Sequence, residues 1–422
     1  MMKKWIKGLL TAVLSTTLVA CSSGTSTTTP TEGGSSSTEA VTVTIWHTYT
    51  EDQEATLQAA ADAFNESQEG ITVVLESQAY EDFTSKVMQA VRAQNGPDII
   101  INFASEAANY VADGLVVNFD NYLDADYAST LPQASYDGAH AFSDGGMYIY
   151  PLVTSGPIFF YNKTIYDELG LTAPTTWDEL VANCEAIKAA YPDKYGFSFD
   201  SLPDGMQTLI TQAGSGMINA ETKSVEFNTP ESVEQLQWFA DNVQNGNFAL
   251  SPTGSYFSDD MNSDMLVSYI GSVAGIPYIE LPNEEELGLA PIPQGLAQDW
   301  APAWDRGAIL FTSTPEREAA AVEFIKFFSG EEWNTAFCLS ANYASPYVAT
   351  QANADYQTYL AENEGLQCLA IDVAGSFPNI PGASTVRTAL EQAATEAATG
   401  TKTAEQALTD AETTANAELQ AN

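Results

Sequence analysis

The fold of this chain is decided by residues 41–101, VTVTIWHTYTEDQEATLQAAADAFNESQEGITVVLESQAYEDFTSKVMQAVRAQNGPDIII. Residues 41–45 alternate valine or isoleucine with threonine, which predicts a half-buried strand. Apolar residues return with a helical period in 57–64 and 80–91, and short apolar strand-like runs occupy 71–76 and 98–101. Strands that alternate with helices in this way predict a parallel sheet covered by helices, which is an α/β fold.

The rest of the chain continues this alternation. Residues 147–162, MYIYPLVTSGPIFFYN, are too long and too rich in β-forming residues for one ordinary strand, so we expect them to cross between two lobes. Thr176 and Glu179 form a capping box that opens a helix, and prolines at first helical positions open others at Pro230 and Pro315. The alanine-rich C-terminal segment predicts two packed helices, with a loosely ordered tail as the alternative.

The N-terminal segment has the pattern of an export signal. Three lysines precede a short apolar stretch within residues 1–20, and this stretch is too short to anchor the chain across a bilayer. It ends in Leu-Val-Ala-Cys, which resembles the lipobox of bacterial lipoproteins, where the cysteine thiol receives a diacylglycerol. We expect a lipoprotein signal peptide over residues 1–20, lipidation at Cys21 and a flexible Ser/Thr/Gly-rich tether over residues 21–40. An ordinary secretory signal with a chance cysteine is the alternative.

Composition excludes several classes of partner. The chain has 422 residues, 45% of them hydrophobic, and 14 Lys and Arg stand against 56 Asp and Glu, a formal charge of −42. The length predicts two or three domains, and the apolar share predicts that they are well cored. The charge argues against binding of nucleic acid and against adsorption to anionic lipid through a basic patch. No stretch after the N-terminal segment is apolar and long enough for a transmembrane helix.

Motifs for catalysis and for metal binding are missing from the sequence. It contains no nucleophile elbow, phosphate-binding loop, zinc-protease helix or EF-hand loop, and its only histidines are His47 and His140. We therefore expect no enzyme, catalytic residue, metal or cofactor, although abundant carboxylates leave a glycoside hydrolase as an alternative. Cys184 lies on an apolar helix face and is expected to be a buried thiol. Cys338 and Cys368 could stay free or pair outside the cell.

Two arginines and two tryptophans are candidates for ligand contacts. Arg306 follows the loop from Trp300 to Asp305 into a predicted strand, and Arg387 lies at a helix start. In so acidic a chain, each arginine could be ion-paired structure or a fork for a phosphate or carboxylate of a ligand. Trp300 and Trp304 could belong to the core or present flat faces to a sugar or a cation.

Four blocks of sequence, taken together and in this order, resemble a known family. They are IWHTYTEDQ (45–53), AYEDFTSKVMQAVRAQNGPDIIINF (79–103), YPLVTSGPIFFYNKTIYDELGLTAPTTWDELVANCEAIKA (150–189) and GAILFTSTPEREAAAVEFIKFFSGEEWNTAFCLSANYASPYV (307–348). The family is that of the extracellular solute-binding proteins (family 1) of ABC importers, in the group that takes up sugars and glycerol phosphates.

The resemblance implies a fold and a division into lobes. The fold would be a two-lobed, periplasmic-binding-protein-like (type II) α/β fold with the ligand cleft between the lobes. Lobe one would comprise residues 41–152 with 308–344, and lobe two would comprise residues 153–307 with 345–422.

Within the family, the binders of glycerol 3-phosphate and glycerophosphodiesters are the most similar, and their motifs imply ligand contacts. Carried over residue by residue, the contacts are Tyr80 in AYED, Glu106 in FASEAAN, Ser155 in TSGP, Ser272 in IGSVAG, Gly307 in DRGA through its backbone amide, Tyr343 in ANYASP and Arg387 in STVRTAL as the phosphate-binding residue. The chain departs from these relatives at 299–308, DWAPAWDRGA, where Trp304 and Arg306 are expected to reshape the cleft. Asp305 would repel a phosphate and suits a sugar hydroxyl better.

The sequence and the resemblance together imply a function. We expect a lipid-anchored protein at the extracytoplasmic face of a bacterial cell membrane, a monomer that captures a glycerophosphate or a saccharide by lobe closure. Its partners would be the solute and the permease subunits of an ABC transporter, with the membrane contacted through the lipid alone. The alternative is the same fold binding neutral oligosaccharides for sensing or adhesion without transport.

Overall fold

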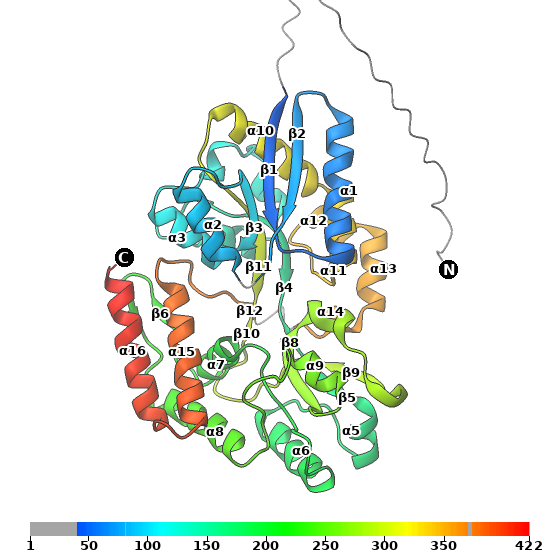
Figure 1. The fold of residues 1–422 in the computed structure, drawn as a ribbon, viewed down its shortest axis with the longest axis vertical. Helices are drawn as coiled ribbons and strands as arrows, with labels where there is room; N and C mark the ends of the chain where they lie inside the picture. The colour runs from blue at the N-terminus through cyan, green and yellow to red at the C-terminus, as the bar shows by residue number, and fades with distance from the viewer. Residues whose placement is uncertain (1–39, 81, 370–373, 422) are drawn as a thin grey trace, which may run out of the picture. The chain divides into compact units, whose positions relative to one another are not determined.

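The computed structural model describes residues 40–80, 82–369 and 374–421. The expected signal peptide over residues 1–20, the lipidation site Cys21 and the tether up to residue 39 lie outside the described residues. Within the described ranges, strands and helices alternate along the chain and form two principal sheets (Figure 1).

The first sheet has five strands in the order β2–β1–β3–β11–β4. Their bounds are β1 (Val41–His47), β2 (Ile71–Ser77), β3 (Ile99–Phe103), β4 (Tyr150–Ser155) and β11 (Trp304–Leu310). β1 pairs in parallel with β2 and with β3, so the parallel sheet predicted from residues 41–101 is confirmed. β11 adds an antiparallel strand next to β3, and β4 follows it in antiparallel register.

Both faces of the first sheet are covered, which explains the run of three isoleucines at the start of β3. Ile99 and Ile101 lie in one hydrophobic core, and Ile100 lies in a second core on the opposite face. Neighbouring side chains of a strand point to opposite faces, so a strand segment buried on both sides favours apolar residues at consecutive positions.

Helices on the two sides of the first sheet come from two separate parts of the chain. They are α1 (Glu51–Ser67), α2 (Phe83–Arg92), α3 (Ala104–Ala112), α4 (Gln133–Ala139), α10 (Pro315–Phe328), α11 (Glu331–Ala341), α12 (Val348–Ala352) and α13 (Ala354–Glu362). The helix expected after Pro315 is confirmed, with Thr314 as its N-cap. The helical period predicted from residue 80 becomes α2 from Phe83 onward, and Tyr80 stays outside the helix with its side chain exposed.

The second sheet has three antiparallel strands in the order β8–β5–β9. Its strands are β5 (Pro157–Asn162), β8 (Ser268–Ser272) and β9 (Leu287–Ala290). The surrounding helices are α5 (Lys163–Leu169), α6 (Trp177–Ala190), α7 (Leu202–Gln212), α8 (Pro230–Gln244), α9 (Phe257–Asn262), α14 (Glu364–Gln367), α15 (Ala383–Ala398) and α16 (Ala404–Ala421). The capping box of Thr176 with Glu179 and the helix start at Pro230 are both confirmed.

The chain passes between the two sheets within the segment 147–162, as predicted. β4 ends at Ser155 in the first sheet and β5 begins at Pro157 in the second, with Gly156 between them. A Cβ atom at Gly156 would come within 3.1 Å of the Leu369 side chain and 3.3 Å of the Pro302 carbonyl oxygen, so the crossing segments are packed closely here.

The strand ends differ by a few residues from the lobe limits expected at 152, 307 and 344. β4 and β11 extend the first sheet to Ser155 and back to Trp304, because both strands continue their pairing to the point where the chain crosses. Tyr347 and Tyr356 follow the expected limit at 344, yet both are buried in the core beside the first sheet. The lobe division by residue number therefore remains a proposal.

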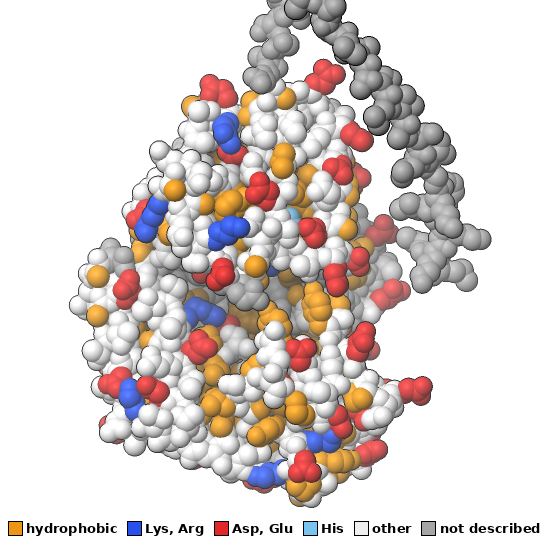
Figure 2. Space-filling model, viewed as in Figure 1, with side chains coloured by type: hydrophobic (Ala, Val, Ile, Leu, Met, Phe, Trp, Pro, Cys, Tyr) orange, Lys and Arg blue, Asp and Glu red, His pale blue; other side chains and the backbone are white. Residues whose placement is uncertain are grey.

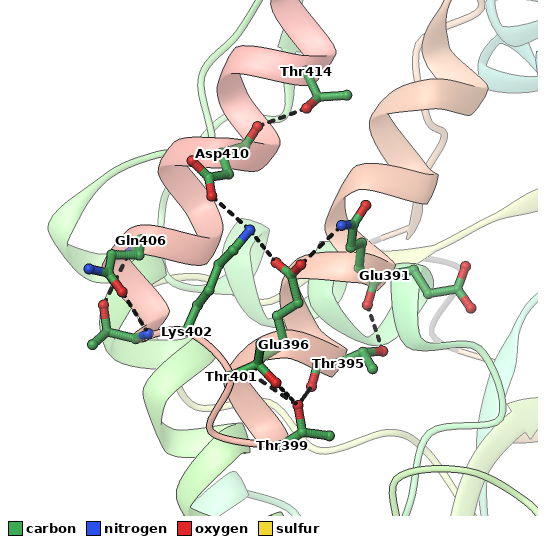
Figure 3. Close-up of polar contacts among 11 residues, drawn as sticks. Glu391, Thr395, Glu396, Thr399, Thr401, Lys402, Gln406, Asp410 and Thr414 are labelled. Carbon is green, nitrogen blue, oxygen red and sulfur yellow. Dashed lines mark hydrogen bonds and ion pairs between the residues drawn. The ribbon is translucent and has the colours of Figure 1, made fainter.

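The alanine-rich C-terminal segment forms the packed helices α15 and α16. Leu390, Leu408 and Leu419 are all buried in the core that also covers the second sheet. The turn between the helices is held by Lys402, whose Nζ atom lies 2.8 Å from Glu396 and 2.7 Å from Asp410 (Figure 3). The small alanine side chains allow close helix contact, so this segment packs as an ordered hairpin and is not a loose tail.

The three cysteines in the described residues are free and buried. Cys184 lies in the core of the second sheet, as predicted from its helix face. Cys338 lies in a core of the first sheet, and Cys368 lies in a separate core beside the second sheet. The two thiols therefore belong to different cores and form no disulfide.

Candidate ligand-binding site

One cavity of about 1280 Å³ is lined by residues from both sheets. It gathers eight of the nine residues expected to bind ligand, and these come from distant parts of the sequence. They are Tyr80, Glu106, Ser155, Ser272, Trp304, Arg306, Tyr343 and Arg387. The face shown in Figure 2 is hollowed between the elements of the two sheets, and acidic side chains are scattered around it.

Gly307 is the expected site residue that does not line this cavity. It lies inside the first sheet, opposite Asn102 of β3 and Pro151 of β4. A Cβ atom there would come within 2.3 Å of the Tyr150 carbonyl oxygen. The close approach of β4 explains why a glycine occupies this position. The ligand contact expected through its backbone amide remains a prediction.

Two serine hydroxyls meet where the chain crosses between the sheets. Ser155 at the end of β4 and Ser272 at the end of β8 have their Oγ atoms 3.2 Å apart, within hydrogen-bonding distance. Each hydroxyl can donate and accept, so the pair can offer hydrogen bonds to a ligand from both sheets at once.

Arg387 is not a free fork. Its Nη1 and Nη2 atoms donate to the two carboxylate oxygens of Asp204, at 2.6 and 2.8 Å. Burial alone would lower the pKa of Arg387, but the hydrogen bonds and charge of Asp204 outweigh burial and raise it. The interpretation of Arg387 as ion-paired structure thus describes its present contacts, although it lines the cavity.

Arg306 has a different environment. Its Nη1 donates to the Tyr343 hydroxyl at 3.4 Å and its Nη2 to the Thr48 hydroxyl at 3.3 Å, which are long hydrogen bonds. Its guanidinium carbon lies 5.1 Å from the ring centre of Tyr49 and 4.7 Å from that of Phe103. The side chain is thus fixed by rings and hydroxyls.

Three carboxyl groups at the cavity have raised pKa values. Burial is the main cause for Glu106, Asp200 and Asp305. Hydrogen bonds oppose the effect of burial, from Thr84 at Glu106 and from Thr154 at Asp305. The oxygens of these half-buried carboxyl groups can accept further hydrogen bonds from ligand hydroxyl groups.

Exposed aromatic rings complete the lining. Tyr80, Tyr256 and Tyr278 face the cavity and are each at least partly open to solvent. Tyr256 and Tyr278 were missed by sequence reasoning, because no periodicity or motif marks them. Trp304 lines the cavity, whereas Trp300 does not. Tyrosine rings combine a flat apolar face with a polar edge, which suits the mixed surface of a carbohydrate.

Within the part of the chain that the structure describes, no group of His, Cys, Asp and Glu side chains is arranged to hold a metal ion. None of the helices in those same ranges combines the length and apolar character needed to cross a bilayer. The cavity lining offers hydroxyls, carboxyl groups, side-chain amides, aromatic rings and two guanidinium groups.

Comparison with known proteins finds a matching protein family and related sequences. A family model described as bacterial extracellular solute-binding protein matches residues 59–363. The chain is 23% identical over 367 residues to the sn-glycerol-3-phosphate-binding periplasmic protein of Brucella melitensis, and the match covers 79% of this chain and 81% of that protein.

Solved structures share the fold. The cyclic alpha-maltosyl-1,6-maltose binding protein of Arthrobacter globiformis superposes with a TM-score of 0.77 at 23% identity, covering 91% of this chain and all of that chain. An ABC substrate-binding protein of Listeria monocytogenes, solved with cycloalternan, superposes with a TM-score of 0.78 at 18% identity and covers 90% of this chain. The two-lobed α/β fold expected from the sequence is therefore present, with the cavity between its lobes.

Proposed function

The chain belongs to the bacterial extracellular solute-binding proteins, and from this premise we propose that it captures a small hydroxyl-rich solute and delivers it to an ABC permease. The solute would be a saccharide or a glycerophosphate. These are the two classes that the names of its relatives and structural neighbours suggest.

The observation that carries this proposal is the cavity itself. It is lined from both sheets by paired serine hydroxyls, half-buried carboxyl groups and exposed tyrosine rings. Such a lining can form many hydrogen bonds, which suits a hydroxyl-rich ligand better than an apolar one. Its volume of about 1280 Å³ can hold more than one sugar ring.

Lobe closure would convert binding into a signal for the permease. The connection at Gly156 joins the two sheets directly, and Ser155 and Ser272 approach one another next to it. A ligand that contacts both lobes favours the closed form by the difference between its affinities for the closed and open forms. The permease would recognise that closed form.

The experiment that tests the proposal combines binding with shape. A thermal-shift panel would include glycerol 3-phosphate, glycerophosphocholine and mono- to oligosaccharides. A ligand at 100 times its dissociation constant stabilises the fold by about 2.7 kcal/mol, which is measurable. Small-angle scattering on each hit should show a smaller radius of gyration. A saturating ligand that leaves the radius unchanged would count against closure.

Lipid anchoring at Cys21 is a separate part of the proposal. It is supported by the lipobox-like Leu-Val-Ala-Cys and by the Ser/Thr/Gly-rich segment after it. In cells fed labelled palmitate, the chain should carry label and sediment with membranes. Cys21→Ser should abolish the label and release the chain. A labelled Cys21→Ser protein would show that another residue is modified.

We also propose that the protein binds without catalysis. The support is the absence of recognised catalytic motifs in the sequence and the binding function in the names of its relatives. Incubation of the purified protein with any saccharide that it binds should return that saccharide intact. Hydrolysis that disappears after a single carboxylate substitution would favour the hydrolase alternative instead.

A further inference from the structure

The four arginines of the chain differ in their partners. Three are ion-paired with aspartates at 2.6 or 2.7 Å: Arg92 with Asp113, Arg317 with Asp98, and Arg387 with Asp204. Arg306 makes no ion pair with any carboxylate in the described ranges, although the chain carries 56 acidic residues. The exception, Arg306, lies in β11 of the first sheet and lines the cavity.

The Arg306 side chain is also poorly supplied with hydrogen bonds. The residue is only 9% exposed, and its Nε atom is buried without any partner in the described structure. Its two hydrogen bonds, to Tyr343 and Thr48, are long at 3.4 and 3.3 Å. A guanidinium group has five N–H donors, so most of its donor capacity is unused. Burying an unpaired charge in this way costs free energy.

The neighbouring aromatic rings hold the Arg306 guanidinium group in place without accepting hydrogen bonds from its N–H groups. Tyr49 and Phe103 lie 5.1 and 4.7 Å from the guanidinium carbon, which are cation–π distances. These contacts stabilise the charge through the ring faces but do not accept the in-plane N–H hydrogen bonds. The Tyr49 hydroxyl is itself buried without a partner. The site is therefore rigid, cationic and short of acceptors.

The backbone adds to this rigidity. Arg306 sits in β11 opposite Phe103 of β3 and Val153 of β4, next to an irregularity in the pairing with β4. Its neighbour Asp305 points to the other side of the strand, where it accepts a hydrogen bond from Thr154 at 2.8 Å. Alternation along the strand keeps the acidic group from neutralising the guanidinium group.

Arg387 offers the opposite case in the same cavity. Both of its terminal nitrogens already donate to Asp204. An anion approaching Arg387 would meet the Asp204 carboxylate as well, so its attraction is largely cancelled. The anionic group of a ligand is thus better received at Arg306 than at the arginine that family resemblance assigns to phosphate.

We propose that Arg306 is an anion-binding group of the cavity, and that the solute is a polyol that bears a carboxylate or phosphate. This inference rests on the proposed function and narrows its solute class. A carboxylate or phosphate oxygen would supply the acceptor that the guanidinium group lacks, in charge-assisted hydrogen bonds. Sugar acids and polyol phosphates share this chemistry, and matched probes separate them.

The test compares charged probes with neutral counterparts by calorimetry on the purified protein. The pairs are galacturonate with galactose, oligogalacturonates with galacto-oligosaccharides, and glycerol 3-phosphate with glycerol. At least one acidic probe should bind more tightly than its neutral partner. Arg306→Gln should weaken that probe by at least ~30-fold, and Arg306→Lys should weaken it less. Arg92→Gln, which removes an exposed arginine outside the cavity, is the control and should leave binding unchanged.

A stability measurement separates a binding role from a structural one. Removal of an unpaired buried charge should leave the melting temperature of the unliganded Arg306→Gln protein unchanged or raised. A structural Arg306 would lower it and leave the preference for acidic probes intact. If Arg306→Gln does not fold, Arg306 has a structural role and the inference is likewise overturned. The preference for acidic over neutral probes, measured in the wild-type protein and in Arg306→Lys, then gives the independent check.

The possible outcomes distinguish a failure of this inference from a failure of the proposed function on which it rests. Neutral probes that bind as tightly as acidic ones overturn the role of Arg306 and leave the proposed function standing. A preference for acidic probes that survives Arg306→Gln but disappears in Arg387→Gln overturns it too, in favour of Arg387. Failure of every probe, neutral and acidic, counts against both.

Discussion

Arg387 of α15 donates to both carboxylate oxygens of Asp204 in α7, at 2.6 and 2.8 Å, across 183 positions of sequence. The pair ties the C-terminal helical hairpin to the elements around the second sheet. It also occupies the arginine that sequence comparison assigns to phosphate. We therefore expect this contact to contribute to the stability of the protein and to weaken the attraction of Arg387 for an anionic ligand.

Asp204→Asn should destabilise the protein, because it leaves the Arg387 guanidinium group partly buried without its charged partner. We expect a loss of about 2 kcal/mol in the free energy of unfolding, measured by urea denaturation. Asp113→Asn breaks the exposed pair with Arg92 and is the matched control, with an expected loss below ~1 kcal/mol. Equal losses in the two variants would show that the Arg387 pair has no special weight.

Asp305→Asn should change the pH dependence of stability. Burial raises the pKa of Asp305, while hydrogen bonds from Thr154 and Ser376 oppose the rise. The native state therefore holds this proton more tightly than the unfolded chain does. Its contribution to the free energy of unfolding is full below the ordinary pKa of about 3.9 and falls as the pH rises through the native pKa. The variant should gain stability relative to wild type toward neutral pH.

Asp144→Asn provides the control of opposite sign. The hydrogen bond from Tyr148 lowers the pKa of Asp144, so its contribution is present at neutral pH and lost as the pH falls through the native pKa. Thermal melts between about pH 3 and pH 7 should show the two stability differences running in opposite directions at neutral pH, and both differences should shrink as the pH falls. Parallel curves for the two variants would contradict these assignments.

Gly307→Ala should be strongly destabilising. The added Cβ atom would lie 2.3 Å from the Tyr150 carbonyl oxygen and 2.6 Å from the Ile149 side chain, and the backbone of β4 cannot move away without breaking sheet pairing. We expect a loss of about 2–3 kcal/mol or more by chemical denaturation. At Gly70 a new Cβ atom meets its nearest neighbour at 3.7 Å, so Gly70→Ala should be nearly neutral. A stable Gly307→Ala protein would mean that the β4 approach is looser than described.

Tyr80→Ala should weaken solute binding while leaving stability almost unchanged. Tyr80 is 55% exposed and lines the cavity. The substitution therefore removes little packing, but it takes one aromatic ring away from the ligand. We expect roughly a tenfold loss of affinity in calorimetry, which corresponds to about 1.4 kcal/mol. Tyr195 is 45% exposed and does not line the cavity, which makes Tyr195→Ala the control. Equal affinities for the two variants would remove Tyr80 from the site.

Much of the fold was predictable because its signals are local. The parallel sheet follows from apolar alternation and helical periods within residues 41–101, which repeat over distances of a few residues. The helix starts at Thr176, Pro230 and Pro315 follow from capping chemistry in the first turn. The crossing within 147–162 follows from a β-rich segment that is too long for one ordinary strand.

The candidate site was predictable in part. Family motifs pointed to six residues that the tertiary fold brings to one cavity, and the departure from those motifs pointed to two more, Trp304 and Arg306. The motifs also pointed to Gly307, which does not line the cavity and lies where β4 approaches closely. Tyr256 and Tyr278 were missed because a ring on an irregular segment has no periodic signal. Their place in the cavity depends on where that segment runs in space.

The sequence by itself determined the α/β class, the helix caps and the passage between two sheets, because each depends on neighbours a few positions away. Only the tertiary structure decided which arginine is paired. Asp204 lies 183 positions from Arg387, and Thr48 lies 258 positions from Arg306. Coulomb attraction and hydrogen bonding act over a few ångströms of space, so a charge is free or neutralised according to the folded chain and not to its sequence neighbours.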